Sequence, residues 1–247
     1  MERRIRIDSA LVVRKLCSSR TEAQELIGQG AVFIDGVVCN KPARLVGEEV
    51  SITLTAKRPF VSRGGEKLKG CLLDVHQAKE NVEKAVQGAV VLDVGSSTGG
   101  FTDCLLQFGA HEVDCVDVGT NQLHESLRND KRIHVFENQD IRTFKTDKEY
   151  DSIVVDTSFI SLKDIIPTLI ALGTPGKTSY YILIKPQFEV GRGNTKKGIV
   201  KNEKLILESI EKVKDTCVSQ EMKNIVLFPS HIPGGDGNQE YFLDGTL

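Results

Sequence analysis

The sequence lacks any long apolar run. No stretch approaches the roughly 20 apolar residues that a membrane-spanning helix needs, and 27% of the 247 residues are charged. The basic N-terminus has only a short apolar part, which Arg14 and Lys15 interrupt, so it lacks the core of a signal peptide. We therefore expect a globular chain with no membrane span and no secretory leader.

The sequence also lacks paired cysteines. None of its six cysteines belongs to a Cys-x-x-Cys motif, and most have apolar neighbours. This pattern predicts buried free thiols, and we expect no metal site. Free thiols are typical of a reducing compartment, so the expected location is the cytoplasm.

Charge is distributed unevenly, although the net charge is only -2. Residues 1–69 carry 13 Lys and Arg against 8 Asp and Glu, whereas the remainder carries 19 against 26. A basic head on an acidic body favours contact with a polyanion such as nucleic acid. An ordinary solvated surface is the alternative interpretation.

Residues 1–55 predict a small α+β unit with the order helix, helix, hairpin, strand. Ser19 and Glu22 have the spacing of a capping box, and Asp35-Gly36 fits a type I′ turn between two apolar runs. A linker is expected at residues 56–60, which include Pro59. The second domain is then residues 61–247.

Residues 61–247 alternate between strand and helix patterns, and two closely spaced strands follow near the end. Such alternation predicts an α/β fold with a parallel sheet covered by helices. We expect a Rossmann-like domain with a seven-stranded mixed sheet. The strand candidates are 89–94, 112–116, 133–137, 152–156, 180–184, 223–230 and 239–245.

The stretch VVLDVGSSTGG, residues 90–100, is a buried strand that runs into a glycine-rich turn. It lacks the Gly-Lys-Ser/Thr of a phosphate-binding loop and the G-x-G-x-x-G of a dinucleotide site. Acids follow the first three strands: Asp93 suits an ammonium group, Asp117 ribose hydroxyls, and Asp140 an exocyclic amine. A ligand with these groups and no phosphate is S-adenosylmethionine. A generic strand–turn–helix connection is the plainer alternative.

Asp156 and Lys185 end the fourth and fifth strand candidates, so both should face the same crevice. A lysine directly after a buried apolar run needs a partner, because its charge is costly to desolvate. Lys67 and Glu240 could complete a group that deprotonates and orients a sugar hydroxyl. The plainer alternative for the lysines is a solvated surface position.

Motifs along most of the chain resemble those of the TlyA, or haemolysin-A-like, rRNA methyltransferase family. Residues 6–36 resemble an S4-type RNA-binding domain. The remainder resembles an FtsJ-type ribose methyltransferase, through FVSRGGEKLKG, LDVGSSTGGFTDCLL, DTSFISL, KPQFEVG and GNQEYFL. One departure is Gly-Thr-Asn-Gln-Leu at 119–123, where the family has Gly-Tyr-Gly-Gln-Leu.

The resemblance implies 2′-O-methylation of ribosomal RNA, with cytidine as the target and ribosomal subunits as partners. It implies a catalytic set of Lys67, Asp156, Lys185 and Glu240. It implies donor binding by Asp93, Gly95, Ser97, Gly99, Asp117 and Asp140. It implies RNA contacts by Arg4, Arg6, Arg20, Lys41 and Arg63.

Three other functions compete with this one. A base amino-methyltransferase would carry two prolines in the motif after the fourth strand, and DTSF has none. A pore-forming haemolysin would need an amphipathic or membrane-spanning segment. An RNA-binding protein with weak or no methyltransferase activity would not need the four catalytic candidates.

Overall fold

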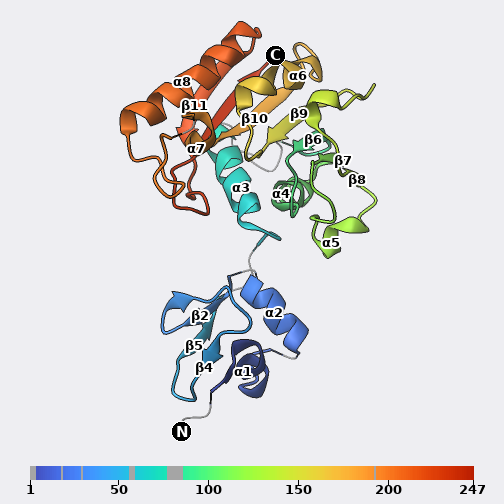
Figure 1. The fold of residues 1–247 in the computed structure, drawn as a ribbon. Helices are drawn as coiled ribbons and strands as arrows, with labels where there is room; N and C mark the ends of the chain where they lie inside the picture. The colour runs from blue at the N-terminus through green and yellow to red at the C-terminus, as the bar shows by residue number, and fades with distance from the viewer. Residues whose placement is uncertain (1–3, 18, 29, 56–58, 77–85, 192) are drawn as a thin grey trace. The chain divides into compact units, whose positions relative to one another are not determined.

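The computed structural model describes residues 4–17, 19–28, 30–55, 59–76, 86–191 and 193–247 (Figure 1). The chain divides into two compact units, residues 1–62 and 63–247. The sequence interpretation instead places a linker at 56–60, of which residues 56–58 lie outside the described part.

The first unit has the predicted two helices, hairpin and final strand in that order, and it adds two short antiparallel strands that the sequence did not predict, Ile5–Arg6 and Leu45–Val46. Its core joins the two helices to the sheet through side chains such as Leu11, Ile27 and Val32. Asp35 and Gly36 have φ values of 49° and 78°, as the predicted type I′ turn requires. The elements are β1 (Ile5–Arg6), α1 (Ile7–Val13), α2 (Arg20–Gly28), β2 (Val32–Ile34), β3 (Val37–Val38), β4 (Leu45–Val46) and β5 (Ile52–Leu54).

The second unit contains the predicted seven-stranded mixed sheet, in the order β11-β12-β10-β9-β6-β7-β8. The strands from β10 to β8 are parallel, and β12 runs antiparallel between β10 and β11. The strands are β6 (Val90–Val94), β7 (Glu112–Val116), β8 (Ile133–Phe136), β9 (Ser152–Val155), β10 (Ser179–Ile184), β11 (Lys223–Pro229) and β12 (Tyr241–Thr246).

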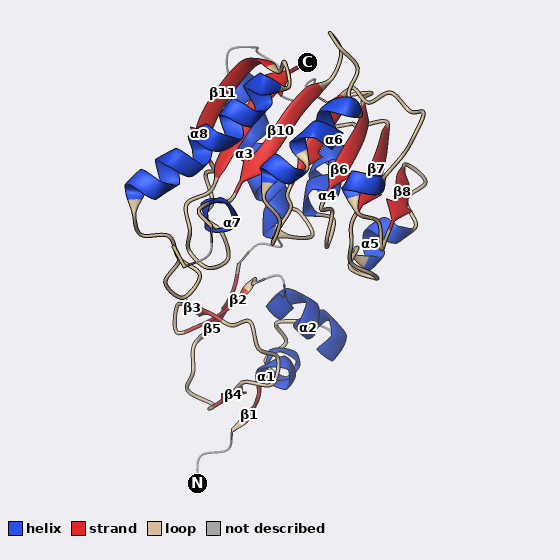
Figure 2. Cartoon of the chain, turned by 45° about the horizontal axis from the view of Figure 1, so that its top comes forward, coloured by secondary structure: helices blue, strands red, loops and turns tan. Residues whose placement is uncertain are grey.

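Helices cover both faces of this sheet, with α3 and α4 on one face and α6 and α8 on the other (Figure 2). Strands such as β9 are buried along their whole length, which explains their continuous apolar sequences. None of the described helices is both long and apolar enough to cross a membrane. The helices are α3 (Arg63–His76), α4 (Gly100–Gln107), α5 (Glu125–Arg128), α6 (Ile166–Ala171), α7 (Pro186–Glu189) and α8 (Glu203–Ser219).

All six cysteines are free thiols. Cys17 in the first unit is partly exposed, and the other five are buried. Burial raises the pKa of the Cys104 and Cys115 thiols well above the ordinary value.

Candidate active site

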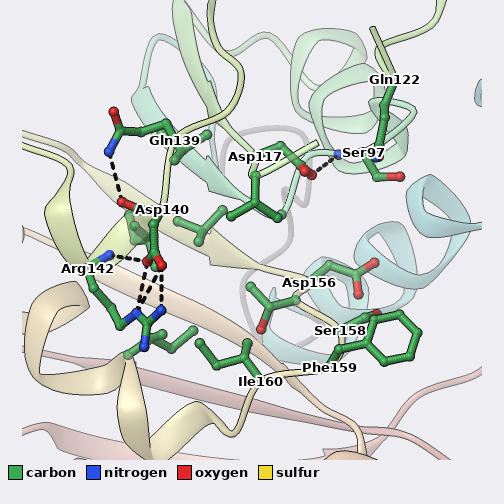
Figure 3. Close-up of a pocket in the computed structure, with 17 residues that line it drawn as sticks. Ser97, Asp117, Gln122, Gln139, Asp140, Arg142, Asp156, Ser158, Phe159 and Ile160 are labelled. Atoms are coloured by element: carbon green, nitrogen blue, oxygen red, sulfur yellow. Dashed lines mark hydrogen bonds and ion pairs between the residues drawn. The ribbon is translucent and has the colours of Figure 1, made fainter. Parts of the chain in front are cut away.

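A cavity of about 520 Å³ opens at the carboxyl ends of β6, β7 and β9 (Figure 3). Ligands of open α/β sheets bind at this edge. Four of the six predicted donor-binding residues line the cavity, namely Gly95, Ser97, Asp117 and Asp140. Asp93 and Gly99 do not line it.

Two glycines of the first turn serve different contacts. Gly95 has a φ of +82°, and a Cβ there would lie 2.6 Å from the carbonyl oxygen of Asp156. Gly99 has a φ of +88°, and its Cβ would lie within 2.6 Å of methyl groups of Leu123 and Leu127. Gly95 therefore lets the turns after β6 and β9 meet beside the cavity, whereas Gly99 lets α4 begin against two leucines.

Asp117 is fixed at the cavity by two backbone donors. Its Oδ2 accepts a hydrogen bond from the Ser97 N–H at 2.8 Å (Figure 3). Its Oδ1 accepts one from the Gly119 N–H at 2.7 Å. Each carboxylate oxygen can accept a second bond, so hydroxyl groups could still bind here. The departure at Asn121 has a φ of 55°, a conformation that asparagine tolerates better than most residues.

Asp140 is held by Arg142, a residue that the sequence interpretation missed. The carboxylate accepts from the Arg142 N–H at 2.9 Å and from its guanidinium Nη2 at 2.5 Å (Figure 3). This guanidinium lowers the pKa of Asp140. Both side chains line the cavity, so an exocyclic amine would share the carboxylate with Arg142.

Asp93 is fully buried and directly precedes Val94 and Gly95, which line the cavity. Its Oδ2 accepts from the Thr102 hydroxyl at 2.6 Å, while Oδ1 has no hydrogen-bond partner in the described part of the chain. Burial, and then the nearby carboxylates of Asp156 and Asp117, raise the pKa of Asp93 to about 7. A cation near Oδ1 would compensate this unpaired oxygen.

Asp93→Asn tests this burial through pH. The folded-state pKa of about 7 exceeds the unfolded value of about 3.9, so the folded chain retains a proton that the unfolded chain loses. The wild type therefore loses stability as the pH rises from about 4 through 7, and the variant lacks this loss. We expect the Tm of the variant minus that of the wild type to be roughly 3–8 °C larger at pH 8 than at pH 5. Equal differences at both pH values in thermal melts would contradict the assignment.

Lys185 follows β10 and is largely buried. Its Nζ lies 2.6 Å from Asp156 Oδ1, and it donates a hydrogen bond to the Ser158 hydroxyl at 2.8 Å. Asp156 and Ser158 both line the cavity. The charge of Lys185 is therefore compensated at the cavity edge, as its buried position requires.

Lys67 and Glu240 form a second ion pair. Lys67 lies on α3, and its Nζ donates to Glu240 Oε2 at 2.5 Å, with both side chains buried. Ile184 pairs with Tyr241 across the antiparallel strands β10 and β12. Lys185, which follows Ile184, and Glu240, which precedes Tyr241, therefore lie at the same edge of the sheet. The four predicted catalytic residues thus form two ion pairs at this edge.

Three contacts tie α3 to residues 231–240. The Arg63 Nη2 donates to the Pro233 carbonyl oxygen at 2.5 Å, and His231 Nε2 lies 2.8 Å from Asp74 Oδ2. The third is the Lys67–Glu240 pair. Arg63, which the sequence analysis assigns to RNA, thus holds the segment that carries Glu240.

Gly234 makes room for the carboxylate of Glu240. A Cβ at Gly234 would lie 2.5 Å from Glu240 Oε1. Any larger residue would therefore displace the acid that pairs with Lys67.

Phe159 is the most exposed aromatic residue that the structure describes. Its side chain is 91% exposed, its φ is +64°, and it lines the cavity next to Ser158. The ring centroid lies 5.0 Å from that of Phe188. The exposed ring is therefore available to a group that enters the cavity. The sequence interpretation missed Phe159, which is only an apolar residue within the DTSF motif.

A buried carboxylate organises two of the predicted RNA-binding arginines. Asp8 is fully buried, and its Oδ2 lies 2.9 Å from Nη2 of both Arg6 and Arg20. The Gln24 side chain also donates to Oδ2, at 3.1 Å. The hydrogen bond from Arg6 is the main cause that lowers the pKa of Asp8 far below its ordinary value. The arginine side chains are 44% and 55% exposed, so both keep a solvent-facing side. Arg4 and Lys41 are exposed.

Among the described residues, one group has the side chains and spacing of metal ligands: Glu112, Asp114 and His134. The Lys148 ammonium contacts Glu112 and lies 2.7 Å from Asp114 Oδ1. The Tyr150 hydroxyl donates to the other oxygen of Asp114 at 2.8 Å. The carboxylates are thus already paired with protein groups.

Two family models match the chain: an FtsJ-like methyltransferase over residues 60–246 and an S4 domain over residues 5–52. The 16S/23S rRNA (cytidine-2′-O)-methyltransferase TlyA of Mycobacterium tuberculosis is 40% identical over 98% of this chain and 90% of its own length. Hemolysin A of Brachyspira hyodysenteriae is 37% identical over 96% of this chain and 98% of its own length.

A solved structure from Streptococcus thermophilus, provisionally named a hemolysin, matches 100% of this chain over 89% of its own length. Its TM-score is 0.73 and its sequence identity 33%. The family and fold expected from the motifs are therefore confirmed. The chain belongs to the FtsJ-like methyltransferase family and carries an S4 domain at its N-terminal end.

Proposed function

We propose that the chain transfers the methyl group of S-adenosylmethionine to a ribose 2′-hydroxyl of ribosomal RNA, at a cytidine. The observation that carries the proposal is the presence of two lysine–carboxylate ion pairs, one buried and one largely buried, at the edge of the sheet where the cavity opens. The relative from Mycobacterium tuberculosis is named for this reaction on 16S and 23S rRNA. Ribosomal RNA as substrate would place the chain in the cytoplasm with ribosomal subunits as partners.

The cavity residues suit S-adenosylmethionine. Asp117 would accept hydrogen bonds from the ribose hydroxyls, and Asp140 would face the adenine amine. The unpaired Oδ1 of Asp93 beneath the turn would favour the ammonium group. A Cβ at Gly95 would crowd the same edge. When bound, the donor supplies an electrophilic methyl group on a sulfonium.

The ion pairs suit a ribose hydroxyl as acceptor. Lys185, held by Asp156 at the edge of the cavity, has one of two roles: it orients the 2′-hydroxyl in line with the methyl group, or it accepts the hydroxyl proton as the general base. Lys67, held by Glu240, positions the ribose from α3.

Phe159→Ala tests a stacking role for the exposed ring. A nucleotide taken out of an RNA stack is stabilised by aromatic side chains, each worth about 1–3 kcal/mol per base. We expect KM for ribosomal RNA to rise about 5- to 100-fold, with the affinity for S-adenosylmethionine within about twofold of the wild type. Phe159→Tyr is the matched control and should retain a low KM. Wild-type KM in Phe159→Ala would exclude stacking.

Asp8→Asn separates positioning from charge in the S4 domain. The substitution removes a negative charge, so charge alone predicts tighter RNA binding. If Asp8 instead fixes Arg6 and Arg20 for phosphates, the affinity for ribosomal RNA should fall about tenfold. Arg20→Lys keeps the charge but loses the planar guanidinium, and should weaken binding in the same direction. Tighter binding by a folded Asp8→Asn variant, checked by circular dichroism, would refute positioning.

The decisive experiment is mass mapping of ribosomal RNA after incubation of purified subunits with isotope-labelled S-adenosylmethionine. We expect the label on the ribose of a cytidine. A label on a base would overturn the ribose assignment, and no label above the background of an enzyme-free reaction would overturn the activity.

A further inference from the structure

The connection between α7 and α8 contains a tight hairpin that no site described above uses. The Lys196 N–H donates to the Ile199 carbonyl oxygen at 2.9 Å, and the Ile199 N–H donates back at 3.1 Å. The two residues at the tip, Lys197 and Gly198, have φ values of 52° and 80°. These values define a type I′ turn, which strongly favours asparagine or glycine over lysine at its first position. We call residues 196–199 the lysine hairpin.

A buried amide fixes the lysine hairpin to the catalytic edge. Asn238 is only 4% exposed. Its Nδ2 donates to the Gly198 carbonyl oxygen at 2.8 Å, and its Oδ1 accepts from the Val200 N–H at 2.9 Å. Asn238 lies two residues before Glu240, so the hairpin is anchored to the segment that carries that acid.

The hairpin is positively charged within an acidic unit. Lys196, Lys197 and the following Lys201 are exposed, and none forms an ion pair within the described part of the chain. The sequence between Val190 and Asn202 contains no acidic residue. The acid nearest the tip is Asp236, whose Oδ2 lies 3.8 Å from where a Cβ at Gly198 would be. The local charge is therefore positive although residues beyond 69 are acidic overall.

We propose that the lysine hairpin is a second RNA-binding surface, which grips phosphates of the strand that carries the target nucleotide. The proposal rests on ribosomal RNA being the substrate. Phosphate contacts set the register of a nucleic acid without reading its sequence. A basic tip anchored beside Glu240 would set that register at the catalytic edge, independently of the S4 domain.

The test uses the full chain with Lys196→Ala and Lys197→Ala combined. The probe is deproteinised ribosomal RNA, and equilibrium binding is measured over a range of salt concentrations. We expect the affinity to fall about tenfold, and the slope of log K against log salt to become shallower by about 1.4–1.8, for two lost phosphate contacts. The affinity for S-adenosylmethionine should match the wild type.

Lys212→Ala with Lys223→Ala is the matched control, because both lysines are exposed and lie on α8 and β11. It removes the same charge and should leave RNA affinity and salt slope unchanged. An equal loss in both double variants would reduce the effect to net charge and overturn the proposal. A wild-type salt slope in the hairpin variant would also overturn the proposal. So would a hairpin variant that binds ribosomal RNA like the wild type but has lost binding to anionic phospholipid vesicles.

Binding is read without methyl transfer, which separates the two proposals. If the hairpin variant keeps the wild-type salt slope and the wild type methylates ribose, only the hairpin proposal is overturned. If the hairpin variant has a shallower salt slope and the wild type gives no methylation in the mass mapping, only the proposed activity is overturned.

Discussion

Lys185→Ala should lower methyl transfer to ribosomal RNA by about 10²- to 10⁴-fold, the range expected when a positioned acid–base group is lost. The Lys185 ammonium lies 2.6 Å from Asp156 at the edge of the cavity. Its removal leaves a hydroxyl with no group to orient it or to accept its proton. The lysine does not line the cavity itself, so donor binding measured by calorimetry should remain within about threefold.

Lys163→Ala provides the control, because this lysine is exposed and does not line the cavity. It should retain full activity. Lys185→Arg preserves the charge but not the point-like ammonium or its ability to deprotonate, and should stay strongly impaired. Unchanged ribose methylation by Lys185→Ala would refute the mechanism, whatever the donor affinity.

Gly95→Ala should weaken the binding of S-adenosylmethionine by about 100-fold or more, equivalent to about 3 kcal/mol. The added Cβ would lie 2.6 Å from the Asp156 carbonyl oxygen, so the turns after β6 and β9 must separate. That separation distorts the cavity and displaces the carboxylate that pairs with Lys185. Calorimetric titration of the donor measures the effect.

Gly176→Ala is a close control for backbone conformation. Gly176 has a similar φ of +72°, but nothing lies within 4 Å of its would-be Cβ. Both variants carry the cost of a left-handed alanine, of order 1 kcal/mol, and only Gly95→Ala adds the collision. Equal donor affinities in the two variants would show that close approach at Gly95 is unimportant.

The sequence predicted the central strands β6, β9 and β10 well because they are buried almost along their whole length and therefore have continuous apolar sequences. The strand predicted at 112–116 matches β7, and the other strands lie close to their predicted bounds. The hairpin turn at Asp35-Gly36 was equally readable, because its left-handed conformation restricts the residue types.

Contacts distant along the chain were less readable. The Lys67–Glu240 ion pair joins residues 173 positions apart, and nothing in local spacing selects Lys67 from the other lysines after the first unit. The sequence offered Lys67 only as a candidate beside the alternative of a solvated surface lysine, and the family resemblance favoured the catalytic assignment. The Arg63–Pro233 and Asp8–Arg20 contacts depend in the same way on tertiary packing, so the sequence indicated basic residues without their partners.

The sequence also did not predict which of these side chains are exposed and which are buried. Phe159 belongs to a motif rich in apolar residues, where burial is the natural expectation, yet a left-handed backbone presents its ring to solvent. Asn238 shows the reverse, because a polar residue in a glycine-rich loop is buried and uses both ends of its amide on the lysine hairpin.

The uneven burial of the thiols makes the chain chemically addressable at one position. Five cysteines are enclosed by the protein, and Cys17 alone is partly exposed. A maleimide dye applied to the folded chain should therefore attach to Cys17, three residues before Arg20. The wild-type chain thus offers a spectroscopic reporter within its S4 domain without any engineered cysteine.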